Sequence, residues 1–240
     1  MEKRYNNPGI EEALCEFQFL PNQPWDITIP GLIYDKIKEE FSEKEQELGL
    51  TVVPKEDYAK VQVVPPKIQF FREDKKALVQ VAPNFLAINH LKPYPSWDNF
   101  KPMIIRNFNI YKEIANPKGF KRIELRYINV FNFDKGVFVA KDYFNYYPNI
   151  PKGLPEVYTE FRTNIEFSYE NNNEVLRLGV ATLMPEKPNT VRIVLDIAYI
   201  MEKMEFITFD KIDEWLDKAH KNVECAFESC ITDKTRQLLM

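Results

Sequence analysis

The chain has 240 residues, of which 45% are hydrophobic and 28% are charged, and these proportions are ordinary for a globular protein. Its formal net charge is −4, from 32 basic and 36 acidic residues, so the composition lacks the electrostatic footprint of a general nucleic-acid-binding protein. The 18 Phe, 12 Tyr and 3 Trp predict a sizeable core and much β-sheet, because aromatic side chains bury large areas and favour strands.

The chain start, the apolar runs and the cysteines indicate the cellular compartment. The opening residues 1–5 are not followed by the apolar region of a signal peptide, and the longest apolar runs are far shorter than a membrane span. The odd count and irregular spacing of Cys15, Cys225 and Cys230 fit reduced thiols. We therefore expect a soluble, cytoplasmic protein with no membrane association.

The first half of the chain predicts a strand, a helix, four strands and a second helix. Residues 10–20 alternate between apolar and polar side chains, which is typical of a half-buried strand. A helix is predicted from Pro30 to about Gly49, with a buried stripe at Ile33, Ile37, Phe41 and Leu48 and glutamates on its solvated face. Strand candidates follow at 51–64, 67–72, 77–81 and 85–91, before a helix capped by Ser96 whose stripe is Phe100, Ile104, Phe108, Tyr111 and Ala115.

The second half repeats this order in a shorter form. Strands are predicted at 120–133, 157–170, 174–184 and 190–201, with a weak helical segment at 141–147. A last helix opens at Thr208 or Asp210 and runs toward the C-terminus, with a buried stripe at Ile212, Leu216, Ala219, Val223, Phe227 and Ile231.

This element order predicts an α+β fold in which antiparallel sheet packs on long helices. The order is β-α-β4-α in residues 1–118 and β-(α)-β3-α in residues 119–240, so we expect two tandem halves that form one compact unit, with one continuous sheet or two. TATA-binding proteins use a unit of similar order twice. That analogy concerns the fold and carries no function.

Several segments together resemble one protein family. The segment Asn7-Pro8-Gly9-Ile10-Glu11-Glu12-Ala13 resembles an N-terminal Asn-Pro-Pro-Ile-x-Glu-Ala motif, and residues 122–129 resemble an Arg-(Leu/Ile)-Gly-Leu-Arg-Tyr-Ile-Asn strand. Residues 194–197 resemble a Leu-Asp strand, and residues 215–232, with Trp215 five residues before His220, resemble a C-terminal helix. The chain is thus similar to a sporadically distributed, uncharacterised prokaryotic protein family of about 250 residues.

The chain departs from the family pattern at two positions. Gly9 replaces the second proline, which changes the stiffness of a loop, and Glu124 replaces a glycine before Leu125, which puts a charge where close backbone approach is typical. The resemblance implies no established activity. It implies a bacterial or archaeal cytoplasmic protein in variable gene neighbourhoods, which points toward host defence or mobile-element biology.

Asn129 is the first candidate site residue. It falls on the apolar face of the predicted strand 120–133, together with Ile123, Leu125, Tyr127, Phe131 and Phe133. A buried amide without hydrogen-bond partners costs about 1 to 3 kcal/mol, so Asn129 must find partners. Two interpretations remain open: Asn129 bonds to neighbouring backbone or marks a bulge, or it lines a ligand pocket.

The opposite face of the same strand carries Arg122, Glu124 and Arg126, and the strand at 190–201 carries Asp196. Pairing of these strands would produce a charged lattice across the sheet. One interpretation is a solvent-facing surface with cross-strand ion pairs. The other is a polar binding surface on which Arg126 clamps an anion and Asp196 orients that anion or binds a metal. A carboxylate within a strand is disfavoured unless paired, so an arginine on an adjacent strand is the simplest partner for Asp196.

No cofactor or metal site is expected. Asp196 has no second carboxylate at fixed spacing, and Cys225 and Cys230 would point in different directions from one helix. The sequence contains no Gly-rich phosphate loop and none of the motifs Gly-x-Ser-x-Gly, His-Glu-x-x-His and Cys-x-x-Cys. His220 is expected beside the buried stripe of the last helix rather than as a general base, and His90 in a loop at a strand end.

Three functional hypotheses follow. The leading one is a non-catalytic binding module that recognises a protein partner or small ligand through its sheet face or the groove between its halves. The second is a hydrolase or nuclease-like enzyme, which requires Arg126, Asp196 and either Glu11 or His220 to converge in one pocket. The third is nucleic-acid binding, which the net charge does not indicate but which a basic patch formed on folding would permit. A homo-oligomer is compatible with all three.

Overall fold

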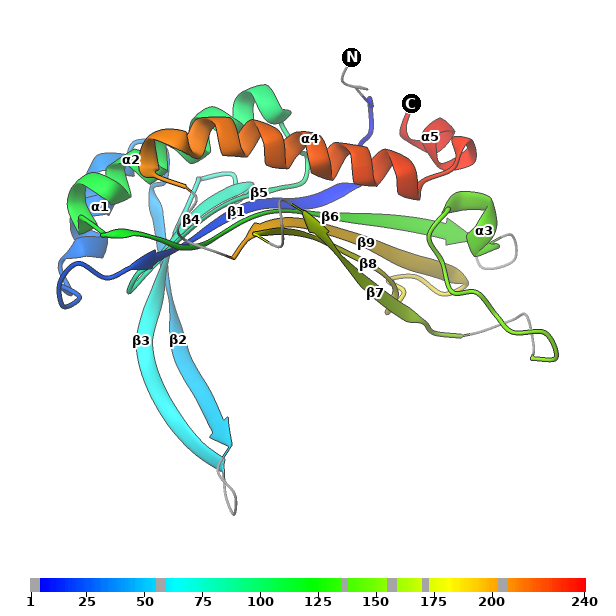
Figure 1. Ribbon diagram of the computed structural model, residues 1–240, viewed down its shortest axis with the longest axis horizontal. Helices are drawn as coiled ribbons and strands as arrows, with labels where there is room; N and C mark the ends of the chain where they lie inside the picture. The colour runs from blue at the N-terminus through cyan, green and yellow to red at the C-terminus, as the bar shows by residue number, and fades with distance from the viewer. Residues whose placement is uncertain (1–4, 55–58, 135–137, 155–158, 170–172, 203–206) are drawn as a thin grey trace.

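A computed structural model of the chain describes residues 5–54, 59–134, 138–154, 159–169, 173–202 and 207–240, with side chains described outside 48–65. The protein is an α+β fold built on one nine-stranded antiparallel sheet, which confirms the predicted fold class at that level. Helices α1 (Ile29–Ile37), α2 (Trp97–Ala115) and α4 (Ile212–Cys230) lie over one face of the sheet. The hairpin of β2 (Glu43–Pro54) and β3 (Ala59–Phe71) projects away from the sheet on the other side (Figure 1). Among the described residues, no helix is both long and apolar enough to cross a membrane.

The sheet has the strand order β2-β3-β4-β5-β1-β6-β9-β8-β7. Its two central strands are β1 (Ile10–Leu20) and β6 (Gly119–Asp134), which pair antiparallel. Each central strand also pairs with the last strand of its own half: β1 with β5 (Phe85–Leu91), and β6 with β9 (Thr190–Met201). The remaining strands are β2 (Glu43–Pro54), β3 (Ala59–Phe71), β4 (Ala77–Ala82), β7 (Arg162–Tyr169) and β8 (Glu174–Leu183).

Alternation along β1 and β6 separates a buried face from a polar one, as the sequence pattern predicts. Ala13, Cys15, Phe17 and Phe19 of β1 are buried beneath the helices, and the residues between them are only partly covered. Phe19 stacks on Tyr111 of helix α2 at 4.6 Å between ring centroids. The aromatic side chains therefore lie largely in the layer between the sheet and the helices, where each ring can bury most of its area.

Two helices of 19 residues cover the sheet, α2 (Trp97–Ala115) and α4 (Ile212–Cys230). The shorter helix α1 (Ile29–Ile37) lies on the same face. The predicted stripe of α2 is buried at Phe100, Ile104, Phe108 and Tyr111, and the helix ends at Asn116 in the left-handed conformation. The two remaining helices, α3 (Ala140–Tyr143) and α5 (Asp233–Leu239), lie together at one end of the molecule (Figure 1).

The prediction of a helix from Pro30 to Gly49 is wrong beyond Ile37. Helix α1 ends there, and residues 43–54 form strand β2 instead. Glutamates that resembled a solvated helix face lie on β2, where Glu43 and Glu45 contact Lys75 of the turn between β3 and β4 at 2.6 and 3.0 Å. Pairing with β3 over residues 59–71 therefore overrides the local helical pattern.

The second half follows the predicted order with two corrections. Strand β7 begins at Arg162, and residues 155–158, which carry the start of the predicted strand 157–170, lie outside the described residues. The last helix does not continue to the C-terminus: α4 ends at Cys230, Ile231 forms a β-bridge with Phe144, and α5 follows. That break turns the end of the chain back toward its beginning.

The edge strand β7 has an exposed apolar row. Ile165 and Phe167 are each 41% exposed and Tyr169 is 37% exposed, although they lie on the face that the helices cover elsewhere. The strand itself was predicted. Its apolar row stays partly exposed because no helix of the described chain extends over this edge.

Candidate functional site

A cavity of about 300 Å³ lies between the sheet, helix α4 and the N-terminal segment. Its volume is at the lower end of the range for small-molecule sites. Aromatic rings, a few apolar side chains and several polar groups line it together: Tyr5, Asn6, Pro8, Ile10, Tyr94, Pro95, Ser96, Trp97, Tyr127, Asn129, His220, Val223, Glu224, Phe227 and Glu228.

Helix α4 supplies one wall through a single face. Its lining residues lie three, four, seven and eight positions after the first of them, which places them in a row along the helix: His220, Val223, Glu224, Phe227 and Glu228. The sheet supplies the opposite wall through Tyr127 and Asn129 of β6, which alternate onto the helix-covered face. Sequence analysis selected Asn129 and His220, and the cavity brings these two together.

Asn129 satisfies both interpretations that the sequence left open. It is 2% exposed, and its Nδ2 donates to the backbone carbonyl of Leu195 at 3.2 Å. It also lies opposite a register shift in β1, between Ile10 and Glu12, and it lines the cavity. Its amide is therefore held by the sheet while it contributes to the wall.

Trp97 and His220 form a stacked pair at one end of the cavity. Their ring centroids are 4.2 Å apart and their planes differ by 10°, and the indole Nε1 donates to Asp217 at 3.3 Å. Tyr127 meets the His220 ring at 5.9 Å and bonds to Tyr94 through their hydroxyls at 2.9 Å. These contacts join the segment before α2, the centre of β6 and helix α4 into one wall.

Burial lowers the pKa of His220 to about 4, against the opposing effect of the Asp217 and Asp98 carboxylates. The imidazole is therefore neutral near pH 7. Trp97 covers one face of the imidazole ring. A neutral ring in this position suits a packing and lining role.

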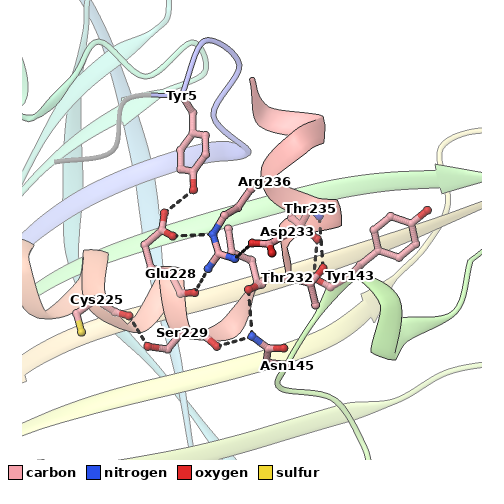
Figure 2. A network of polar contacts seen from close by, with 11 residues as sticks. Tyr5, Tyr143, Asn145, Cys225, Glu228, Ser229, Thr232, Asp233, Thr235 and Arg236 are labelled. Carbon is pink, nitrogen blue, oxygen red and sulfur yellow. Dashed lines mark hydrogen bonds and ion pairs between the residues drawn. The ribbon is translucent and has the colours of Figure 1, made fainter. Parts of the chain in front are cut away.

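The other end of the cavity is closed by a polar network between the two ends of the chain (Figure 2). The hydroxyl of Tyr5 donates to Glu228 Oε1 at 2.5 Å, and Arg236 Nε of α5 donates to Glu228 Oε2 at 2.9 Å. Burial, followed by the nearby Glu228 carboxylate, raises the pKa of Tyr5 to about 12, so the phenol stays protonated and can donate. Glu228 thus links the N-terminal segment, α4 and α5.

Backbone contacts fix the N-terminal segment over the cavity. Asn7 N–H donates to the carbonyl of Leu239 at 2.9 Å, and Asn6 Nδ2 donates to the carbonyl of Met240 at 2.6 Å. Gly9 lies so close to β6 that a Cβ atom there would be 3.0 Å from the Phe131 ring. The glycine that departs from the family motif is therefore suited to this close approach.

The described lining residues of the cavity include two carboxylates. They belong to Glu224 and Glu228, and the described lining includes no Lys or Arg. Arg236 offsets part of the Glu228 charge from behind, since it contacts that carboxylate at 2.9 Å and does not line the cavity. The cavity thus combines aromatic rings with acidic groups.

Ser96 lies at the rim in a backbone conformation that glycine normally occupies. Its φ is 111° and its ψ is 161°, and its side chain makes no capping bond to helix α2. This region costs a non-glycine residue about 1 to 3 kcal/mol, and such strain gathers at functional sites. Ser96 Oγ instead accepts from Asn99 Nδ2 at 3.1 Å.

This conformation makes a testable stability prediction. Ser96→Gly is expected to be at least as stable as the original chain and about 1 to 3 kcal/mol more stable than Ser96→Ala, because alanine keeps the strain and glycine releases it. Both variants lose the hydroxyl, so the difference between their free energies of unfolding in urea reports the backbone strain alone. Equal stability of the two variants would contradict the strain.

A buried carboxylate anchors helix α4 to the sheet. Glu174 of β8 is 5% exposed and accepts from Trp215 Nε1 at 2.8 Å and from the Tyr199 hydroxyl at 2.6 Å. Lys218 contacts the same carboxylate at 2.5 Å. Sequence analysis missed this residue, because nothing local distinguishes it from an exposed strand-end glutamate.

Arg126 and Asp196 lie on the other face of the sheet, away from the cavity. Arg126 Nε and Nη2 donate to the two oxygens of Asp196 at 2.7 and 2.5 Å, as the simplest interpretation of Asp196 predicted. The pair raises the pKa of Arg126, chiefly through this hydrogen bonding. The charged lattice continues beside it, where Arg122 contacts Glu16 and Glu124.

Glu11 does not join either group. It lies 3.8 Å from Lys92 in an exposed ion pair and is not a lining residue of the cavity. The five candidate residues therefore divide into three places: Asn129 and His220 at the cavity, Arg126 with Asp196 beneath the sheet, and Glu11 at the surface.

A second hollow of about 440 Å³ lies beside helix α2. Its two arginines are already paired, Arg72 with Asp74 at 2.8 Å and Arg106 with Glu40. His90 also lines this hollow and is 4% exposed within β5, which corrects its predicted loop position. With its charges paired, this hollow is a weaker candidate than the first cavity.

Within the described residues, no three His, Cys, Asp or Glu side chains gather as a metal site requires. Neither a scan against protein-family models nor a search of curated proteins finds a match for this chain. The cavity is therefore interpreted from its own chemistry.

Proposed function

We propose that this protein is a non-catalytic binding module that holds a small ligand in the cavity between β6, α4 and the N-terminal segment. The observation that carries the proposal is the cavity itself: about 300 Å³, lined by rings from four separate parts of the chain together with several polar groups. Small-molecule sites have this mixture of apolar walls and a few placed polar groups.

The enzyme alternative is not supported by the positions of its candidate residues. It required Arg126 and Asp196 to converge with Glu11 or His220. Tyr127 of β6 faces the cavity with His220, and Arg126, the preceding residue, points to the opposite face of the sheet. The sheet therefore separates Arg126 and Asp196 from His220, and Glu11 pairs with Lys92 at the surface, so these groups do not form one site.

Nucleic-acid binding is also less favoured than ligand binding. The arginines on the face opposite the helices are engaged with carboxylates, because Arg122 contacts Glu16 and Arg126 contacts Asp196. Phosphate contacts require basic groups that are available to the backbone of the nucleic acid.

We further propose that the chain consists of two tandem halves, 1–118 and 119–240, in one compact unit of TATA-binding-protein-like order. The sheet order supports this, because each half pairs its first strand with its last and the first strands β1 and β6 meet at the centre. A cytoplasmic prokaryotic setting, in defence or mobile-element biology, follows from the motif resemblance and belongs to the same proposal. A protein partner or a second copy also remains proposed, and the exposed row on β7 supports it.

The ligand proposal is tested by filling the cavity. Ile10→Trp is expected to abolish ligand capture because Ile10 is a partly buried lining residue whose replacement would occupy the cavity. Ile27→Trp is the matched control, since Ile27 is 88% exposed and outside the cavity. Each full-length protein is dialysed to equilibrium against a bacterial metabolite extract, and retained compounds are identified by mass spectrometry.

We expect a compound enriched by the original chain and by Ile27→Trp and lost from Ile10→Trp, with circular dichroism showing that both variants are folded. Equal enrichment by the two variants would place binding elsewhere and contradict the proposal. If no compound is enriched by the original chain, the cavity has no ligand in that extract and the proposal also fails.

A further inference from the structure

Strand β7 lies at one edge of the sheet, and the direction of its backbone groups follows from its pairing with β8 (Figure 1). The carbonyl of Phe161 accepts from the N–H of Thr182 at 3.0 Å, so the odd-numbered residues along β7 point their backbone groups toward β8. Successive residues of an antiparallel strand point their N–H and C=O groups in opposite directions. The N–H and C=O groups of Arg162, Asn164 and Glu166 therefore point away from β8.

The two edges of the sheet differ in how they are protected against a further strand. Proteins protect sheet edges with charged side chains, prolines and bulges. The opposite edge strand, β2, has a register shift between Glu47 and Gly49, ends at Pro54 and begins with a charged run, 43–45. Strand β7 pairs with β8 without a register shift, and its sequence contains no Pro, Gly or Lys. Its outer edge is therefore suited to pair with another strand.

The apolar row of β7 supplies surface that a further strand would bury. Ile165 and Phe167 are each 41% exposed, although Leu178 and Leu176, which face them on β8, are 5% and 3% exposed. The core thus continues to the edge of the sheet, where the described chain leaves it partly open. Burial of apolar surface favours association roughly in proportion to the area removed from water.

The charges of β7 are self-complementary in one antiparallel register. Arg162 and Glu166 lie two residues on either side of Asn164, on the face opposite the apolar row. A twofold axis at Asn164 would place Arg162 of each copy opposite Glu166 of the other copy. The same axis pairs the three residues whose backbone groups point outward. An axis at Glu166 would instead place two carboxylates opposite each other, which is unfavourable.

Both side chains are able to make this contact. Arg162 is exposed and takes part in no ion pair within the described part of the chain. Glu166 is already paired with Arg177 of β8, but that contact uses one oxygen, since Arg177 Nε and Nη2 lie 2.7 and 2.5 Å from Oε2. A carboxylate can accept from more than one guanidinium group. Glu166 can therefore keep Arg177 and accept from Arg162 of another copy through Oε1.

We infer that two copies of this chain associate by antiparallel pairing of β7 with β7 about a twofold axis at Asn164. The pairing adds about six backbone hydrogen bonds, two for each of three facing pairs, and makes one sheet of the two. It also covers Ile165 and Phe167 and forms the Arg162–Glu166 contact twice. Because each copy uses its only β7 edge, the contact closes as a dimer.

Sedimentation velocity tests the dimer with the full chain at about 100 μM. The original chain is expected to sediment as a dimer. Asn164→Pro is expected to be monomeric, because proline removes an N–H that points away from β8 and leaves the bonds to β8 in place. Arg162→Glu is expected to weaken the dimer about tenfold, because it places carboxylates opposite each other twice. Lys221→Glu, the same charge change at an exposed position of α4, is the control and is expected to remain dimeric.

Disulfide formation tests the register. Cys225 is exposed, so the variants are made on a Cys225→Ser background. Asn164→Cys is expected to cross-link two copies, because residues that face each other in a hydrogen-bonded pair have Cα atoms about 5.5 Å apart. Glu166→Cys would place the two Cα atoms roughly 14 Å apart, so that variant is expected to stay reduced.

The outcomes are separate from those of the ligand proposal, because no residue of β7 is among the described lining residues of the cavity. A monomeric original chain would overturn the inference. So would a dimer that persists unchanged in Arg162→Glu and in a folded Asn164→Pro, with folding checked by circular dichroism. Cross-linking of Glu166→Cys in preference to Asn164→Cys would contradict the axis at Asn164. The capture experiment with Ile10→Trp decides ligand binding independently.

Discussion

Replacing Glu174 with alanine is expected to lower the free energy of unfolding by about 3 kcal/mol or more. The carboxylate is 5% exposed and has three partners on two elements: Tyr199 of β9, and Trp215 and Lys218 of α4. Alanine would leave the buried phenol and indole donors unpaired. Lys218 is 39% exposed and would recover water, so the indole and phenol carry most of the cost.

The measurement is urea unfolding followed by circular dichroism, with two comparison variants. Glu174→Gln keeps an oxygen acceptor and loses the charge, so it is expected to fall between the original chain and Glu174→Ala. Glu214→Ala removes an exposed glutamate from the first turn of α4 and is expected to stay within about 0.5 kcal/mol of the original chain. A loss below about 1 kcal/mol for Glu174→Ala would contradict the anchoring role of this carboxylate.

The second large expected effect is a dependence of stability on pH that arises from His220. Burial lowers the pKa of this imidazole from 6.5 to about 4 in the folded chain, so the unfolded chain takes up a proton at higher pH than the folded chain does. The stability that neutral His220 preserves is fully present above pH 6.5. It is lost as the pH falls from 6.5 toward 4, by about 3 kcal/mol at most.

His220→Phe removes this dependence and keeps a ring against Trp97. Other carboxylates lie near the imidazole, notably those of Asp98, of Asp217 on the same helix and of Glu224 one turn away, and His220→Phe leaves them in place. The test is therefore the difference in unfolding free energy between the two proteins, measured from pH 7 to pH 4. That difference is expected to shift in favour of His220→Phe as the pH falls, and parallel curves would contradict a neutral, buried imidazole.

The sequence predicted those parts of the fold that depend on short periodicities. Alternation over residues 10–20 and 120–133 identified the two central strands and their buried faces, and helical spacing identified α2 and most of α4. The failures arose where distant partners decided the outcome. Residues 43–49 resembled part of a charged helix, and their pairing with β3 and with Lys75 makes them a strand.

The cavity was predictable only in part for the same reason. Asn129 was noticed because an amide on an apolar face needs an explanation, and it does line the cavity. The Tyr5–Glu228 bond joins residues 223 positions apart, and the Trp97–His220 stack depends on how α2 and α4 meet. No local sequence pattern reveals contacts between residues so far apart in the chain. The acidic and aromatic character of the site could therefore be recognised only from the folded structure.

The most direct test of the ligand site is the position of a bound compound relative to the rings. In a solution of the full chain saturated with the compound that the capture experiment identifies, nuclear Overhauser effects are measured from the protons of that compound to assigned aromatic protons. We expect contacts with Tyr127, Phe227 and Trp97, which are among the rings that line the cavity. Contacts confined to rings outside it, such as Phe167 of β7, would contradict ligand binding in the cavity.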